Sequence, residues 1–99
     1  MNWVNTWEKI FNSFDMLKKM LADRSECDEN CIEVFDPPYS IKMLKKEKIV
    51  VFQLEGENIA TLDKRGLHNH SDEHLEVVQE WCTALTSLGF KRYRTKSKS

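Results

Sequence analysis

The centre of the chain carries an apolar run that turns back on itself. Residues 49–52 are all apolar, the segment passes through Gln53 to Leu54, and after Glu55-Gly56-Glu57 a second largely apolar segment follows at residues 59–62. β-Branched and aromatic residues favour strands, and glycine supplies the positive φ that a tight turn requires. The pattern therefore predicts a β-hairpin. Because Val50, Val51 and Phe52 are consecutive, it also predicts a strand buried on both faces, with a helix on each side.

Both ends of the chain show helical periodicity. In the first segment, large apolar side chains recur at intervals of three and four residues and so share one helical stripe; they are Trp3, Trp7, Ile10, Phe14, Leu17 and Leu21. A second stripe consists of Leu75, Val78, Cys82 and Leu85. We predict one helix over residues 3–21, capped by Asn2 or Asn5, and a second helix that starts at Ser71 and ends before Gly89.

The segments between these elements complete the predicted fold. Residues 31–35 and 39–43 have the composition of strands, and Asp36-Pro37-Pro38 separates them as a turn, because proline cannot donate to a sheet. We interpret residues 23–30 as a linker, residues 45–48 as a charged turn and residues 64–70 as a loop.

The pattern as a whole predicts an α+β fold. We expect an N-terminal helix, an antiparallel meander of three or four strands and a C-terminal helix packed on the sheet. Residues 1–90 form a single α+β domain, and residues 91–99 form a basic tail. The chain is 40% hydrophobic and 31% charged, which is typical of a globular domain that folds without a disulfide or a metal.

The charge is unevenly distributed. The formal net charge is -1, but five cations and no acid lie in residues 90–99, which leaves 10 basic and 16 acidic groups, a net charge of -6, on residues 1–89. A nucleic-acid-binding domain usually has a basic folded face, so the acidic body argues against that class. We expect no membrane segment, a cytoplasmic location and reduced thiols at Cys27, Cys31 and Cys82.

Two short motifs have the residue types of catalytic sites. Asp36-Pro37-Pro38-Tyr39 resembles the catalytic tetrapeptide of methyltransferases that act on the amino group of adenine, a resemblance that implies an acid and a stacking aromatic ring at a flipped base. It covers only four residues, and the sequence lacks a glycine-rich cofactor loop. Cys82 lies on the apolar stripe of the second helix, so we interpret it as a core residue. We therefore predict no enzymatic activity and no cofactor.

The histidines form the densest set of candidate metal ligands. The order of His68, His70, Asp72 and His74 resembles the signature of metallo-β-lactamase-like hydrolases, with Glu73 inserted before the last histidine. A simpler zinc site would use His70 and His74 with His68 or a thiolate from Cys27 or Cys31. The alternative interpretation of these residues is a polar loop that caps the second helix.

The preferred function is a small intracellular module that binds another protein as an inhibitor, adaptor or regulator. The candidate contact residues are Trp3 and Trp7, because tryptophan is enriched at interfaces, and Glu55 and Glu57, because an acidic body complements a basic partner such as a nucleic-acid-binding protein. The broad stripe of the first helix leaves homodimerisation open.

Two alternatives remain. One is a nucleic-acid-associated protein that uses the basic tail through Lys91, Arg92, Tyr93 and Arg94. The other is a zinc-organised binding domain built on His68, His70 and His74.

Overall fold

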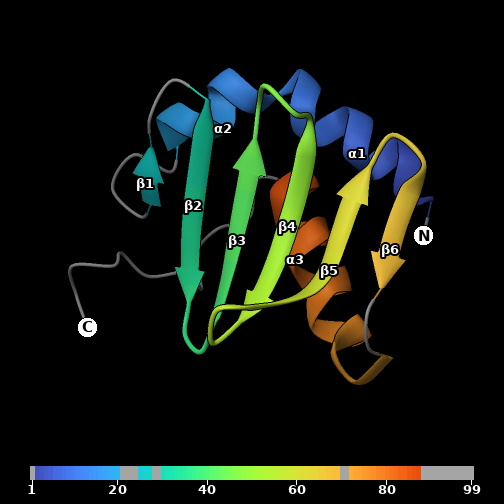
Figure 1. Cartoon of the computed structure of the whole chain (residues 1–99). Helices are drawn as coiled ribbons and strands as arrows, with labels where there is room; N and C mark the ends of the chain where they lie inside the picture. The colour runs from blue at the N-terminus through green and yellow to red at the C-terminus, as the bar shows by residue number, and fades with distance from the viewer. Residues whose placement is uncertain (1, 21–24, 28–29, 70–71, 88–99) are drawn as a thin grey trace.

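A six-stranded antiparallel sheet with helices on one face makes up the fold (Figure 1). The computed structural model describes residues 2–20, 25–27, 30–69 and 72–87. In chain order the elements are α1 (Trp3–Asn12), α2 (Phe14–Met20), β1 (Ser25–Cys27), β2 (Cys31–Asp36), β3 (Tyr39–Leu44), β4 (Ile49–Leu54), β5 (Glu57–Asp63), β6 (Gly66–Asn69), the 3-10 turn η1 (Asp72–His74) and α3 (Leu75–Ser87).

The strands form a simple meander. Their order across the sheet is the same as their order in the chain, and every neighbouring pair is antiparallel. The α+β prediction is confirmed, and so are the four predicted strands. Two further strands were missed: β1 lies inside the predicted linker, and β6 lies inside the predicted loop. Both are short and polar, and each is held by pairing with one longer strand.

The central hairpin has a two-residue turn. Glu55 and Gly56 both have positive φ, 51° and 86°, the combination that type I′ turns require and that matches the twist of the flanking strands. The backbone N–H of Glu55 donates to the carbonyl oxygen of Pro38 at 3.0 Å, which joins this turn to the β2–β3 turn. The register shifts next to Phe52, where β5 carries an extra residue, Ile59.

The predicted first helix is divided in two at Ser13. The backbone N–H of Ser13 donates to the carbonyl oxygens of Lys9 (3.1 Å) and Ile10 (3.3 Å), as at a helix end, and the Leu17 N–H then donates to the Ser13 oxygen at 2.8 Å. Serine competes with the helix for backbone hydrogen bonds, which accounts for the break. The apolar stripe continues across it, since Ile10, Phe14 and Leu17 are all buried. Asn2 is the N-cap, and its side chain accepts from the Asn5 N–H at 3.1 Å.

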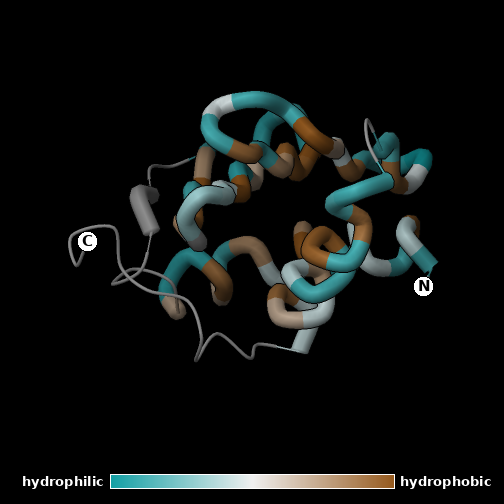
Figure 2. Tube along the Cα trace, turned by 90° about the horizontal axis from the view of Figure 1, so that it is seen from below, coloured by the Kyte–Doolittle hydropathy of each residue, from teal (hydrophilic) through white to brown (hydrophobic). Residues whose placement is uncertain are grey.

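The core lies between the helices and one face of the sheet. Two rows of paired residues form that face: Ile32, Met43, Val50 and Leu62, and Val34, Ile41, Phe52 and Ala60. Trp81 of α3 stacks on the Phe52 ring, with centroids 5.9 Å apart. Residues from α1, α2 and α3 belong to the same buried cluster. Figure 2 shows the sheet and the helices as two layers.

The expectation of a helix on each side of β4 is wrong. Val51 points to the other face and is 8% exposed, but in the register it lies between Lys42 and Thr61 rather than under a helix. That face of the sheet also includes polar pairs; for example, the Lys42 ammonium lies 3.8 Å from the Glu33 carboxylate. Neighbouring side chains on a twisted sheet can cover a central valine without a second layer.

None of the helices within the described ranges is long and apolar enough to cross a membrane.

Candidate functional site

The meander sorts the charged turns to opposite ends of the sheet. In Figure 1 the β3–β4 and β5–β6 turns lie at the upper end, and the β4–β5 turn and η1 lie at the lower end. The lower end carries exposed acids: Glu55, Glu57, Asp72, Glu73 and Glu76. The upper end carries the exposed acid Glu47 and five exposed cations: Lys45, Lys46, Lys48, Lys64 and Arg65. Successive strands reverse direction, so every second turn falls at the same end. The two ends are roughly 20 Å apart, the length of a six-residue strand.

A cleft of about 450 Å³ opens between the two upper turns and α1. We call it the basic cleft, and its lining residues are Trp7, Lys46, Glu47, Lys48, Ile49, Asp63, Lys64 and Arg65. Four of these residues are cations and two are acids, which leaves a net charge of +2 in the lining. Pockets of about 300 to 1,000 Å³ commonly hold a small ligand or one residue of a longer one.

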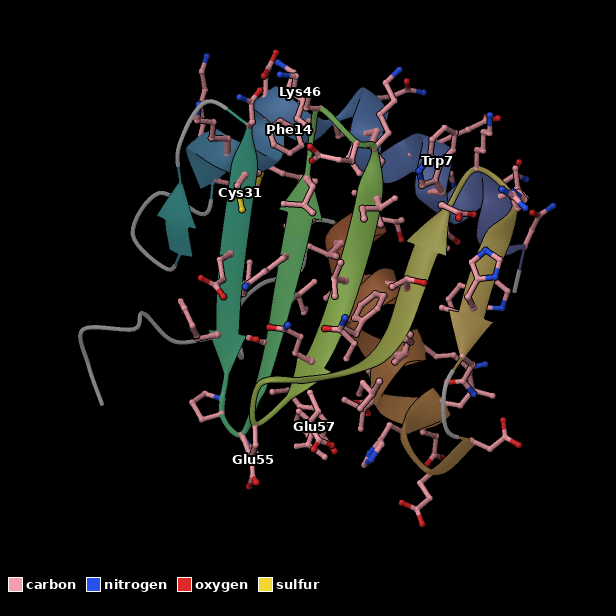
Figure 3. The ribbon with its side chains drawn as sticks, in the orientation of Figure 1. Trp7, Phe14, Cys31, Lys46, Glu55 and Glu57 are labelled. Carbon is pink, nitrogen blue, oxygen red and sulfur yellow. The ribbon has the colours of Figure 1, made fainter. Side chains whose placement is uncertain are left out.

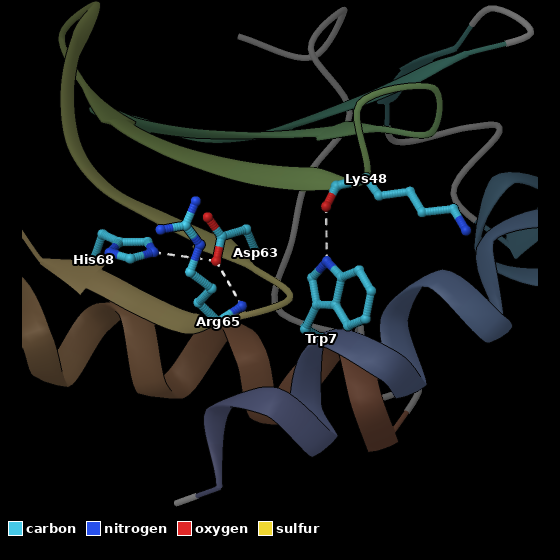
Figure 4. Close-up of polar contacts among 5 residues, drawn as sticks. All are labelled: Trp7, Lys48, Asp63, Arg65 and His68. Atoms are coloured by element: carbon cyan, nitrogen blue, oxygen red, sulfur yellow. Dashed lines mark hydrogen bonds and ion pairs between the residues drawn. The ribbon is translucent and has the colours of Figure 1, made fainter.

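Trp7 is fixed in this cleft by the β3–β4 turn. Its indole N–H donates to the Lys48 carbonyl oxygen at 2.7 Å (Figure 4). Lys48 has a φ of 57°, a left-handed conformation that turns its backbone at this point. The ring also lies near Phe11, with centroids 5.8 Å apart and a tilt of 51°. Trp7 is half-buried, so the bond and the packing hold its orientation while part of the ring faces solvent.

The cations of the upper end differ in what they already bind. The Lys45 ammonium lies 3.5 Å from the Asp15 carboxylate and 5.6 Å from the centre of the Phe14 ring, so it is directed towards α2. Lys46, Lys48 and Lys64 are exposed, and within the described residues no carboxylate lies within 4.0 Å of their ammonium groups. These side chains are therefore available to an anionic ligand.

Asp63 organises the other wall of the cleft. Its Oδ1 accepts a hydrogen bond from the Arg65 backbone N–H at 2.8 Å and lies 3.1 Å from Nε2 of His68 (Figure 4). The pKa of Asp63 is lowered, mainly by the hydrogen bond from the Arg65 backbone and further by His68. Burial acts in the opposite direction and raises this pKa. The ionised carboxylate holds the β5–β6 turn in shape and leaves the Arg65 guanidinium exposed.

The structure also places the other predicted contact residues. Trp3 packs on the start of β6, where a Cβ built on Gly66 would lie 3.7 Å from the Trp3 Cβ. Trp3 and Trp7 both pack partly against the core, so each offers only part of its ring to a partner. Glu55 and Glu57 lie at the lower end of the sheet, whereas Trp7 lies at the upper end (Figure 3) on the same helix as Trp3. The four residues therefore do not form one surface.

The three histidines are only partly described. His68 lies on β6 beside Asp63, whereas Nδ1 of His74 lies 3.2 Å from the Tyr39 hydroxyl. His70 lies outside the described residues, as do Lys91, Arg92, Tyr93 and Arg94 of the tail. Within the described ranges, no group of three or more histidine, cysteine or acidic side chains is arranged to hold a metal. The zinc alternative stays a prediction.

The residue types that suggested catalytic sites, the 36–39 motif and Cys82, lie in a turn and in the core. Pro37 and Pro38 form the turn between β2 and β3, as predicted, and their shared peptide bond is cis. The Tyr39 ring packs edge-on against Trp81, with centroids 5.0 Å apart. Cys82 is fully buried, as predicted, and burial raises the pKa of its thiol to about 12, which suppresses the nucleophilic thiolate.

Sequence reasoning missed the basic cleft as a site. The 45–48 turn is charged in the sequence and Trp7 is a predicted contact residue, but residues 64–70 have the composition of a loop, and the net charge of the body conceals the local cluster of cations. The alternation of turns in a meander is the feature that could have indicated the site, because it brings the turns at residues 45–48 and 64–65 to the same end of the sheet. Without β6, the second of these turns has no defined place.

Comparison with known proteins identifies the family. The model of the Archaeoglobi AF1636 family matches residues 1–97. The chain belongs to this family. An uncharacterized protein of Archaeoglobus fulgidus is 35% identical over 88 residues, which cover 89% of this chain and 92% of that protein. No solved structure matches this AF1636-family chain significantly.

Proposed function

We propose that this AF1636-family protein is a non-catalytic binding module, and that the basic cleft holds the phosphate groups of a nucleic acid. The observation that carries the proposal is that four cations from two separate turns, Lys46, Lys48, Lys64 and Arg65, line one hollow. Lysine and arginine are the usual partners of phosphate oxygens, and such contacts hold a nucleic acid in place whatever its sequence.

The acidic character of the whole body does not oppose this proposal. The exposed acids Glu55, Glu57, Asp72 and Glu73 lie at the lower end of the sheet (Figure 1), whereas Glu47 lies in the cleft lining and is included in its net charge of +2. Roughly 20 Å is more than two Debye lengths at physiological ionic strength, so these acids repel an anion at the upper end only weakly. The local charge of the cleft therefore matters more than the sum over the chain.

The test is a charge-reversal pair with a matched control. Lys46→Glu with Lys64→Glu changes both walls of the cleft, while Lys9→Glu with Lys19→Glu makes the same change in net charge on exposed positions of α1 and α2. Binding of fluorescein-labelled DNA, single- and double-stranded, is measured by anisotropy at several salt concentrations.

We expect the cleft pair to weaken binding roughly 10- to 30-fold, since each exposed charge contact contributes up to about 1 kcal/mol. The slope of log K against log salt should also become shallower by about 1.5 to 2, because two phosphate contacts are lost. An equal loss in the control pair, or no binding of any DNA by the wild-type chain, would contradict the proposal. Deletion of residues 91–99 distinguishes binding in the cleft from binding by the tail, because binding that depends on the tail would be lost.

A second candidate function is recognition of a basic protein by the acidic lower end. Glu55 and Glu57 favour it, because both are exposed at the lower end (Figure 3), Glu55 on the turn and Glu57 at the start of β5. Here Glu57→Lys with Glu76→Lys should slow association with a partner captured from the host and flatten its salt dependence. An on-rate that does not change would refute this electrostatic version.

A further inference from the structure

We infer that the basic cleft is a site for single-stranded nucleic acid, with one base against the indole of Trp7 and its flanking phosphates on Lys46, Lys48, Lys64 and Arg65. The inference rests on the proposed function and deepens it. It depends on the position of one aromatic ring among four cations within a single hollow.

The shape of the site favours a single strand over a duplex. The cleft is concave, lies between two turns and has a volume of about 450 Å³. Proteins that read duplex DNA usually insert a convex element, such as a helix or a two-stranded ribbon, into a groove about 12 Å wide. A hollow of this size instead admits one splayed nucleotide, which only an unpaired strand presents without an unpairing cost.

The indole is prepared to act as a stacking surface. The hydrogen bond of 2.7 Å to Lys48 and the contact with Phe11 fix the Trp7 ring before any ligand arrives. A ring that is already ordered loses little conformational entropy on binding. Aromatic rings interleaved with cations are the usual arrangement of sequence-tolerant single-strand sites, where a stacked base changes affinity by about 5- to 150-fold.

The phosphate contacts come from side chains that can follow a flexible backbone. Lys46 and Lys48 lie on one wall of the cleft, and Lys64 and Arg65 lie on the other. A strand that lies in the cleft therefore has cations from both turns in the lining around it. Asp63 and Glu47 also line the cleft, and their two negative charges are included in its net charge of +2; the Asp63 carboxylate accepts from the Arg65 backbone N–H and lies beside His68.

The experiment compares oligo(dT) and oligo(U) of about 10 nucleotides with a DNA duplex of mixed sequence and similar length, at one salt concentration. We expect both single strands to bind at least about tenfold tighter than the duplex. Trp7→Leu should remove most of this preference, and Trp7→Phe, which keeps a ring, should retain more of it. Trp3→Phe is the matched control, because Trp3 lies on the same helix and does not line the cleft.

Tryptophan fluorescence gives a second, independent measurement. In the Trp3→Phe variant only Trp7 and Trp81 emit, and Trp81 is 1% exposed in the core. Quenching by the single strand in this variant therefore reports a base at Trp7. Circular dichroism of each variant identifies any that fails to fold. If a Trp7 variant fails to fold, the quenching measured in the Trp3→Phe protein decides whether a base lies against Trp7.

The outcomes separate the two proposals. If the duplex binds as tightly as the single strands, or if the Trp3→Phe protein shows no quenching, the single-strand inference is wrong. The proposed function still stands in that case if Lys46→Glu with Lys64→Glu weakens binding. If no nucleic acid binds, both proposals fail. Binding of poly(Glu) as tight as that of the single strands would indicate an acidic protein partner and would also overturn both.

Discussion

Replacement of Glu55 by asparagine should stabilise the protein. Glu55 has a φ of 51° in the turn that joins β4 to β5, and a left-handed conformation costs an ordinary L-residue about 1–2 kcal/mol. Asparagine adopts this conformation more readily, and Asn-Gly is the preferred sequence for a type I′ turn. We expect Glu55→Asn to raise the free energy of unfolding by about 0.5–1 kcal/mol, with a rise in Tm of about 2–8 °C for a domain of this size.

Urea and thermal unfolding of purified variants measure this change. Glu57→Gln is the matched control, because it removes one negative charge from the same hairpin without a change at a positive-φ residue. Glu55→Pro should have the opposite effect, since proline fixes φ near -65° and removes the N–H that donates to Pro38. A Glu55→Asn protein no more stable than Glu57→Gln would refute the argument from backbone conformation.

Three further predictions concern other parts of the molecule. The pKa of Asp63 is lowered in the folded state, so its stabilising contribution is present above about pH 4 and is lost as the pH falls through the folded pKa; wild type should therefore lose more stability in acid than Asp63→Asn, measured by urea unfolding at about pH 5 and about pH 2.5. Cys82 should resist iodoacetamide in the native protein at about pH 8 and react after unfolding, as peptide mass spectrometry would show, because burial raises its pKa to about 12. Gly66→Ala should lower the free energy of unfolding by about 1–2 kcal/mol in the same urea assay, since φ there is 114°, a conformation that alanine rarely adopts, whereas the added methyl group would only be in ordinary contact with Trp3.

The elements that sequence predicted are those with a long apolar pattern. The stripe of Trp7, Ile10, Phe14 and Leu17 identified the helical face that packs on the sheet, and the run from Ile49 to Leu54 identified the central strand. These patterns are local consequences of helix and strand periodicity. The break at Ser13 does not alter the stripe, so the pattern of apolar residues alone did not reveal it.

The elements that sequence missed depend on their neighbours. The strand β6 contains Leu67 as its one large apolar residue and begins with Gly66, so its composition is that of a loop. Pairing with β5 from Ala60 to Asp63 makes it a strand. The candidate site has the same origin, because Lys46 and Lys64 converge only through the alternation of turns across the sheet.

The order of the strands has a consequence for how the chain acquires its core during synthesis. Each hairpin can close as soon as its second strand has been made, because paired strands are neighbours in the chain. The helix α1, although it is made before the strands, packs mainly against β5, β6 and α3. Its apolar stripe must therefore remain uncovered until the late elements emerge from the ribosome, which leaves the nascent α1 segment exposed to chaperones and to aggregation.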